Sequence, residues 1–177
     1  LEVDQLLNET PGNAPKGSTG KIGDYLINAT TAFNDLYYKN YLGTWVKVGS
    51  TAWKASHYTV KGTVQNPASV SGTFTINGTS ITGGSLNAVV SAINSAGISG
   101  VTAASVNTSL AIFSTTSNIV IASVAGTILA DLGLTAGTYY IPQVTTASHT
   151  QVPLYKSTDA NPRPTGSLWI KITAPNL

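Results

Sequence analysis

Short apolar and aromatic runs, separated by turn residues, fill the first third of the chain. They are DYLIN (24–28), DLYYKN (35–40) and TWVKVGS (44–50). Runs of this length and composition are typical of β-strands, so we expect a three-stranded meander. Side chains alternate along a strand, which places Trp45 and Lys47 on one face of the third run and Val46 on the other. Trp45 is expected at the edge of this sheet.

The run TFTINGTSIT (73–82) shows the clearest alternation of apolar and polar positions. Asn and Gly are the residues that a two-residue type I′ hairpin turn prefers, because both of its central positions have positive φ. Asn77 and Gly78 therefore predict a hairpin. Its inward side chains are expected to be Phe74, Ile76 and Ile81.

An amphipathic helix is predicted over residues 86–96. Ser85 is suited to cap its first turn, and Gly97 is suited to end it. Its apolar side chains recur at helical spacing, at Leu86, Val89, Val90 and Ile93. The opposite face is small and uncharged, with Asn87, Ser91, Asn94 and Ser95. We expect this face to be solvated, the alternative being that it packs against a neighbouring element.

Three further strand-like runs follow the helix, at 101–106, 110–115 and 118–124. We expect them to form a second meander packed on the helix. A short helical turn is predicted at 128–133, and extended chain at 137–144, where Pro142 favours an edge or exit position. The fold class is therefore mainly β with an α+β centre: a β-meander repeat plus a small module of strands covered by one amphipathic helix.

Charge divides the chain into parts. Residues 1–61 hold five acids and six lysines, whereas residues 62–154 hold one charge, Asp131. With the turn-rich opening, this pattern predicts an extended leader (1–22), a β-rich repeat module (23–66), an α+β module (67–144), and a linker that leads into a second repeat (145–177). The leader is expected to lie on a neighbouring surface.

Composition excludes several classes of function. Charged residues make up 9% of the chain, against roughly 25% in an average soluble domain. The net charge of +2 is too small for the basic stripe of a nucleic-acid binder. There is no cysteine for a thiolate site or nucleophile. Residues 119–134 are interrupted by polar positions, so no membrane span is expected. The chain lacks an initiating Met and a signal segment, and we expect it to be part of a longer protein.

Candidate catalytic groups are sparse. His57 and His149 have no sequence neighbours that would make a triad or a metal pair. Asp24 and Asp35 could form a glycosidase pair, but both lie in turn-like contexts. Asp131 is expected to cap a turn or face solvent. We therefore predict no catalytic, cofactor-binding or metal-binding residues, and a protein that is not an enzyme.

Aromatic residues gather in the first third of the chain and are the candidate contact residues. They are Tyr25, Tyr37, Tyr38, Tyr41, Trp45, Trp53 and Tyr58, together with Trp169 near the C-terminal end. Core or subunit packing is the favoured role, since Tyr and Trp are common anchors of protein interfaces. Stacking on the sugar rings of a host glycan is the alternative.

The central run from 75 to 134, with the Ile93-Asn94 pair near the end of the predicted helix, resembles the flagellin hook IN motif. The resemblance covers about a third of the chain. It implies a small surface or packing module, of the kind found in flagellins, hook-associated proteins and some phage tail proteins, with no catalytic residues to carry over.

The flanks resemble a different pattern. GDYLIN and DLYYKNYLGTWVKVGS (23–50) are similar to the GDLW and W-V-VG repeat of phage tail-fibre proteins, and GSLWIKIT (166–173) resembles the start of a second copy. Tyr25-Leu26 departs from the usual Leu-Trp. The resemblance implies a structural component of a bacteriophage virion, of tail, fibre or sheath type, whose partners are copies of itself or other virion proteins. The alternative is an adhesion module of a tail fibre or an extracellular bacterial surface filament that binds host glycans.

Overall fold

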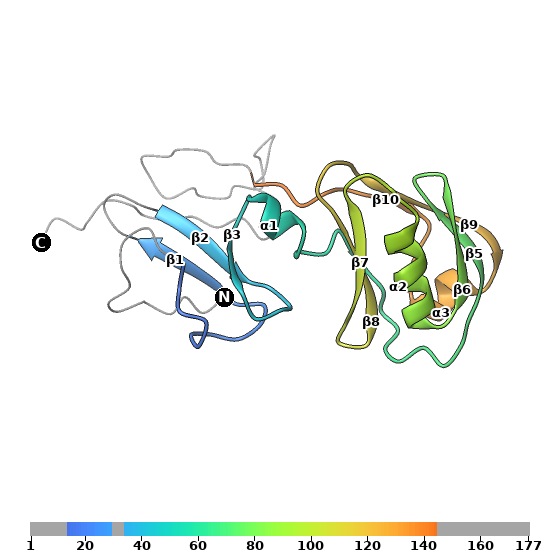
Figure 1. Ribbon diagram of the computed structural model, residues 1–177, viewed down its shortest axis with the longest axis horizontal. Coiled ribbons are helices and arrows are strands. Elements are labelled where there is room, and N and C mark those ends of the chain that lie inside the picture. The colour runs from blue at the N-terminus through green and yellow to red at the C-terminus, as the bar shows by residue number, and fades with distance from the viewer. Residues whose placement is uncertain (1–13, 30–33, 145–177) are drawn as a thin grey trace, which may run out of the picture.

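The computed structural model describes residues 14–29 and 34–144 (Figure 1). Within these residues the chain is mainly β, with three sheets and three helices, which confirms the predicted mainly-β fold with an α+β centre. The N-terminal sheet and the larger central module lie side by side along the longest axis of the molecule.

The N-terminal sheet is the predicted three-stranded meander. Its strands β1 (Tyr25–Ala29), β2 (Asn34–Lys39) and β3 (Trp45–Lys47) pair antiparallel in that order. β3 ends earlier than the sequence predicts, because Ser50 starts a short helix, α1 (Thr51–Lys54). The hydroxyl oxygen of Ser50 accepts a 3.1 Å hydrogen bond from the backbone N–H of Trp53, as an N-cap does.

The predicted hairpin is confirmed. β5 (Val70–Ile76) and β6 (Thr79–Gly84) pair antiparallel across Asn77 and Gly78. These two residues have φ of 50° and 82°, the positive values that a type I′ turn requires. The side chains predicted to point inward are buried, namely Phe74, Ile76 and Ile81.

The predicted helix is confirmed as α2 (Leu86–Ser95). The Ser85 hydroxyl oxygen accepts a hydrogen bond from the backbone N–H of Ala88, and Gly97 follows the helix with φ of 66°. Val89 and Ile93 are fully buried, because they lie on the apolar stripe that faces the sheets.

The predicted second meander is wrong in its strand order. β7 (Val101–Val106) and β8 (Ser109–Ser114) do form a hairpin. The next strand, β9 (Ile119–Gly126), pairs instead with β5 and with β10 (Gly137–Tyr139). The other edge of β8 is taken by β4 (Val60–Lys61). The central module therefore has two sheets, in the orders β10-β9-β5-β6 and β4-β8-β7.

A packing requirement explains why β9 crosses to the other sheet. β8 is buried along its whole length and already has a neighbour on each edge. Pairing with β5 sets Ile121 opposite Ile76, so that both side chains enter the core with Ile119. Such long-range pairing cannot be read from the local alternation of residues.

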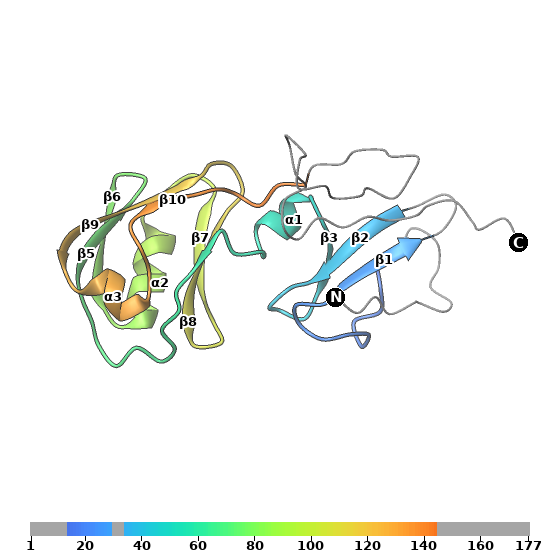
Figure 2. The same cartoon turned by 180° about the vertical axis from the view of Figure 1, so that it is seen from behind.

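One continuous core lies between the two sheets. α2 fills the space between β7 and β6 (Figures 1 and 2), while the short helix α3 (Ile128–Leu132) packs against β5. α2 thus packs against both sheets of the central module. The largest fully buried side chains of this core are Phe74, Ile76, Ile81, Ile93, Leu110, Ile112, Ile119, Ile121, Ile128 and Leu132.

Two segments depart from the predicted organisation. Residues 14–22 of the expected leader form turns that fold back onto the N-terminal sheet, so they do not extend to a neighbour. Val60 and Lys61, assigned to the repeat module, belong to a sheet of the central module. The earlier part of the leader and the predicted second repeat copy lie outside the described residues.

Candidate functional site

The candidate aromatics serve mainly in packing. Tyr37, Trp45 and Leu26 form a small buried cluster on one face of the N-terminal sheet. Tyr38 and Trp53 are buried, Tyr25 and Tyr41 are half-buried, and Tyr58 is exposed to 41%. Trp169 lies outside the described residues. Trp45 sits on an edge strand as expected, yet it is buried because residues 16–20 cover it.

A buried lysine holds the 16–20 loop in place. The ammonium of Lys39, whose side chain is 6% exposed, donates hydrogen bonds of 2.8, 2.7 and 2.9 Å to the carbonyl oxygens of Gly17, Thr19 and Gly20. Three carbonyl acceptors match the three N–H donors of an ammonium, so the buried charge is well solvated by the backbone. Sequence reasoning missed this residue.

Trp45 completes this arrangement from the next strand. Its indole N–H donates to the carbonyl oxygens of Lys16 and Thr19, each at 3.2 Å, and its ring centroid lies 5.7 Å from the Lys39 ammonium. A Cβ on Gly20, which has φ of +67°, would lie 2.9 Å from a ring carbon of Trp45. A glycine is therefore required where the loop crosses the indole. We call Lys39, Trp45 and residues 16–20 the lysine clamp.

An aromatic row covers the opposite face of the sheet and reaches α1. Ring centroids are 5.0 Å apart for Tyr25 and Tyr38, 5.2 Å for Tyr38 and His57, and 5.1 Å for His57 and Trp53. Tyr58 stacks on His57 at 5.5 Å. Distances of 4.5–7 Å are typical of favourable aromatic pairs. The row links β1 and β2 to the segment that enters the central module.

Burial changes the acid-base properties of this row. Desolvation, followed by the charge of Tyr58, raises the pKa of Tyr25. Desolvation also raises the pKa of Tyr38, with smaller effects from Tyr25 and Tyr58. For His57 the same desolvation lowers the pKa, partly offset by a hydrogen bond to the Tyr58 backbone. The Nδ1 atom of His57 and the Nε1 atom of Trp53 are buried without hydrogen-bond partners.

A second aromatic contact joins the N-terminal sheet to the central module. Tyr41, in the turn between β2 and β3, stacks on Phe113 of β8 with 5.4 Å between ring centroids and 22° between ring planes. With Val106 and Ala111, these rings form a cluster on the face of the β4-β8-β7 sheet that points away from the main core. This contact explains why β8 is buried on both faces.

Polar side chains of the central module bond to its own backbone. The Asn94 carboxamide accepts from the N–H of Ala103 at 2.8 Å and donates to the carbonyl of Ala103 at 3.0 Å, which ties α2 to β7. Asn77 makes a similar pair of bonds to the N–H of Val120 and the carbonyl of Asn118. Asn94 belongs to the face of α2 expected to be solvated, yet its side chain makes both of its bonds to Ala103 of β7.

Asp24 and Asp35, the candidate glycosidase pair, each bond to a different group. Asp35 forms a 2.7 Å ion pair with Lys47, and the hydrogen bond that Lys47 donates to this carboxylate raises the pKa of the lysine. Asp24 accepts a hydrogen bond from the backbone N–H of Lys21. Asp35 is paired in the sheet with Asn28, four residues beyond Asp24, so the two carboxylates do not face each other. The structure does not bring them together as a glycosidase pair.

The lone charge of the central module has a structural position. One oxygen of Asp131 accepts hydrogen bonds from the backbone N–H of Ser71 at 2.9 Å and from the hydroxyl of Thr127 at 3.0 Å. Asp131 therefore links α3 to the start of β5. This long-range link differs from the local turn cap and from the solvent-facing position expected for Asp131, because the N–H it binds belongs to a strand 60 residues away.

The outer face of the β10-β9-β5-β6 sheet is exposed and carries no charge. Cross-strand pairing brings Thr75 beside Ser80 and Ala122 on this face, because Phe74 and Ile76 point inward. We call it the neutral face. Its residues are Thr73, Thr75, Ser80, Thr82, Val120, Ala122, Ala125, Thr138 and Tyr140, together with Val124, which is exposed at a bulge of β9.

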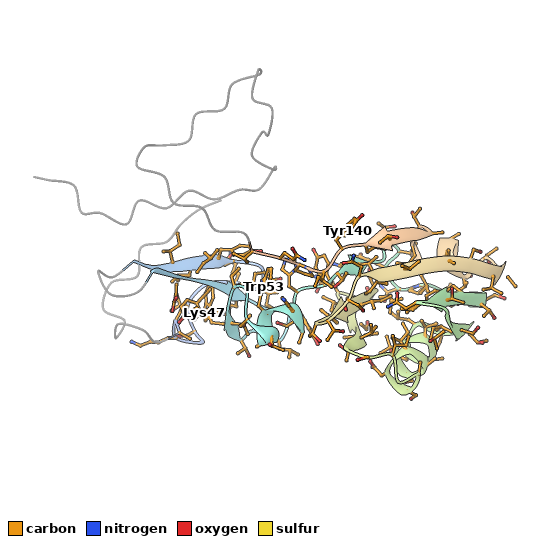
Figure 3. The ribbon with its side chains drawn as sticks, turned by 90° about the horizontal axis from the view of Figure 1, so that it is seen from above. Lys47, Trp53 and Tyr140 are labelled. Atoms are coloured by element: carbon orange, nitrogen blue, oxygen red, sulfur yellow. The ribbon has the colours of Figure 1, made fainter. Side chains whose placement is uncertain are left out.

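Apolar side chains stand out on the neutral face. Val120, Val124 and Tyr140 are exposed to 45%, 59% and 75%. Figure 3 shows Tyr140 at the outer surface beside β10, on the central module, whereas Lys47 lies on the N-terminal sheet. Sequence reasoning did not identify this face, because it depends on the place of β9 between β5 and β10.

The described part of the chain offers few candidates for other kinds of site. A shallow surface depression is lined by Asn66, Pro67, Ser85, Leu86, Asn87, Ser105 and Thr108. Residues 14–29 and 34–144 contain no group of three or more His, Cys, Asp or Glu side chains placed to hold a metal ion. None of the helices in these ranges is long and apolar enough to cross a membrane. His149 lies outside the described residues.

Comparison of the chain with known protein families, with curated proteins and with solved structures found no match. The resemblances to the flagellin hook IN motif and to the phage repeat therefore stay predictions.

Proposed function

We propose that this chain is a non-catalytic structural component of a bacteriophage virion, of tail, fibre or sheath type, that assembles through contacts between subunits. The observation that supports the proposal most strongly is that polar side chains of the chain bond to its own backbone. Lys39, Asn77, Asn94 and Asp131 all form hydrogen bonds with the chain's own main-chain atoms. Side chains used in this way fix the shape of a scaffold and are not available to a substrate.

The surface supports the same proposal. A protein that must stay apart from its own copies usually carries net charge on its exposed faces. The neutral face instead presents small hydroxyl and apolar side chains, and the 62–154 segment holds a single charged residue. Such a surface favours association with another uncharged surface.

The glycan-binding alternative has less support. A platform for sugar rings needs aromatic faces open to solvent. Among the candidate aromatics that the structure describes, Tyr37, Tyr38, Trp45 and Trp53 are buried, and Tyr58 is the exposed one. A glycan array tests the alternative: binding that Tyr58→Ala abolishes would favour adhesion over assembly.

The proposal is tested by sedimentation velocity of the whole chain at rising protein concentration, followed by electron microscopy of the largest species. We expect discrete multiples of the single-chain mass and regular particles. A chain that keeps the mass of one copy at every concentration, and that does not join particles when mixed with other virion proteins, would contradict the proposal.

A further inference from the structure

His57 lies in the connection between α1 and β4, where the chain passes from the N-terminal sheet to the central module. α1 itself lies between these two parts (Figures 1 and 3). The ring of His57 contacts Tyr38 of β2, with 5.2 Å between ring centroids. Two residues later, the backbone N–H of Thr59 donates to the carbonyl oxygen of Ile112 at 2.9 Å, and its hydroxyl oxygen accepts from the N–H of Ser114 at 3.1 Å. The contact between Tyr38 and His57 therefore joins the sheet to a segment that is fixed on β8.

Aromatic rings enclose the imidazole of His57. Besides Tyr38, Trp53 lies 5.1 Å away and Tyr58 lies 5.5 Å away, measured between ring centroids. The Nδ1 atom of the imidazole is buried and has no hydrogen-bond partner. Protonation gives the ring a positive charge and makes both of its nitrogens donors. Burial of a neutral ring in this place costs little, whereas a buried charge without a partner is strongly unfavourable.

The groups around the ring, among the described residues, do not neutralise an imidazolium. The titratable groups that face it are the phenols of Tyr38 and Tyr58, and Tyr25 packs on the far side of Tyr38. The ammonium of Lys61 lies on the Tyr58 ring, and Lys54 is in the last turn of α1. Both of these charged groups are cations, so they oppose a further positive charge at His57.

The three acids of residues 14–29 and 34–144 lie elsewhere. Asp24 accepts from the backbone N–H of Lys21, beside the loop of the lysine clamp. Side chains alternate along β2, so Asp35 lies on the clamp face of the sheet, opposite to Tyr38. Asp131 links α3 to β5. The aromatic row thus occupies a face of the N-terminal sheet on which the described residues place no carboxylate.

We propose that the contact between Tyr38 and His57 opens in acid: protonation of His57 separates the two rings and loosens the N-terminal sheet from the central module, while each part keeps its fold. Burial lowers the pKa of His57 in the enclosed ring, whereas a solvated ring takes up a proton near the ordinary value of 6.5. The open form therefore binds the proton more tightly, and acid shifts the population toward it. The contact is complete above pH 6.5 and is lost as the pH falls toward the lowered pKa.

The change is expected to be local. The main core of the central module contains none of the residues of the aromatic row. On the other face of the N-terminal sheet, the lysine clamp is unaffected, because an ammonium keeps its charge throughout this pH range. The second contact between the two parts is the stack of Tyr41 on Phe113, which has no group that titrates near neutral pH. The two parts should therefore move more independently without coming apart.

NMR relaxation of the backbone amides at about pH 7 and pH 5, the range in which histidine titrates, tests the proposal. At pH 7 we expect one rotational correlation time for both parts of the wild-type chain. At pH 5 the amides of β1, β2 and β3 should show a shorter correlation time than those of the central module. His57→Phe keeps an aromatic ring but cannot be protonated, so it should keep one correlation time at both pH values. The matched control is His149→Phe, which removes the other histidine of the chain and should respond to acid as wild type does.

Titration of the His57 ring protons in the wild-type chain is a second measurement, which does not depend on a folded variant. The midpoint should lie below 6.5 and should coincide with the midpoint of the change in relaxation. A His57 pKa at or above 6.5 would show that a carboxylate or the aromatic rings stabilise the imidazolium, and would overturn the proposal.

Three further results would overturn it. They are unchanged relaxation of wild type at pH 5, an acid response that His57→Phe retains, and an acid response that His149→Phe abolishes. Loss of amide protection in the central module at the same pH would show global unfolding, which contradicts a local opening. All of these measurements use the chain at a concentration at which it has the mass of one copy, so their outcome is independent of the proposed assembly function.

Discussion

Lys39 and Trp45, opposite each other on β2 and β3, donate hydrogen bonds to the same acceptor, the carbonyl oxygen of Thr19. The N-terminal sheet thus holds residues 16–20 through two side chains on one face, while the aromatic row covers the other face. A three-stranded sheet has little core of its own, and coverage of both faces is what makes it stable.

Because Lys39 holds the 16–20 loop, replacing it with an uncharged side chain of similar shape should strongly lower the stability of the chain. Lys39→Met keeps the aliphatic stem but removes the donor from the carbonyl oxygens of Gly17 and Gly20, and leaves that of Thr19 with the Trp45 indole alone. We expect a loss of about 3 kcal/mol in the free energy of unfolding, measured by chemical denaturation. Lys21→Met, at an exposed position, is the control and should change stability by less than about 0.5 kcal/mol. Equal effects of the two substitutions would contradict the role of the clamp.

His57 predicts a pH-dependent stability. Burial lowers the pKa of His57 in the folded chain, whereas the unfolded chain takes up a proton near the ordinary value of 6.5. The stabilisation from neutral His57 is therefore complete above pH 6.5 and is lost as the pH falls below that value toward the lowered folded pKa. The imidazole ring of His57 is faced by Tyr38 from β2, by Trp53 from α1 and by Tyr58. A charged group, the ammonium of Lys61, lies on the Tyr58 ring, 5.7 Å from its centroid.

The measurement is the free energy of unfolding between about pH 7 and pH 5, the range in which His titrates. Wild type should lose more stability over this range than His57→Phe, which keeps an aromatic ring in the row but cannot be protonated. Parallel curves for the two proteins would show that His57 does not contribute to acid sensitivity.

Asn94 predicts a position-specific effect on α2. Asn94→Ala removes both bonds to Ala103 and should cost about 1–2 kcal/mol of stability. Asn94→Asp keeps an acceptor for the Ala103 N–H but cannot donate to its carbonyl, so it should also destabilise. Asn87→Ala on the same helix should have little effect. Hydrogen exchange of the Ala103 amide provides a local readout, and unchanged protection in Asn94→Ala would be inconsistent with the assignment.

Tyr41 predicts how the N-terminal sheet is coupled to the central module. Tyr41→Ala removes the ring that covers Phe113, and should cost about 1–3 kcal/mol through lost stacking and burial. It should also allow the two parts to tumble more independently in NMR relaxation measurements. Tyr41→Phe keeps the stacked ring and is the control. Unchanged relaxation in Tyr41→Ala would mean that other contacts hold the two parts together.

Local signals allowed much of the fold to be predicted. The Asn77-Gly78 turn, the Ser85 cap and the apolar spacing from Leu86 to Ile93 each depend on neighbouring residues, and each was confirmed. The location of β9 was predicted wrongly because it depends on packing of Ile121 against Ile76, which are far apart in sequence. α1 has only four residues and lacks a periodic pattern that could reveal it.

The candidate site was only partly predictable. The aromatic cluster was found from composition, but burial of Trp45 depends on the fold of residues 16–20, which a turn-rich sequence does not specify. Lys39 gave no signal, because a lysine in a strand is usually exposed. The neutral face became visible only with the strand order. Its lack of charge can be read from the sequence, whereas the pairing of β9 between β5 and β10 that assembles it cannot.

Sedimentation velocity of the whole chain, at rising protein concentration and at low and high salt, is the most direct test of assembly through an uncharged surface. An uncharged contact is not screened by ions, so we expect association that grows with concentration and persists at high salt. Association that disappears at high salt would instead assign it to the charged N-terminal part, residues 1–61. A single-chain mass under all conditions would contradict assembly of this chain with its own copies.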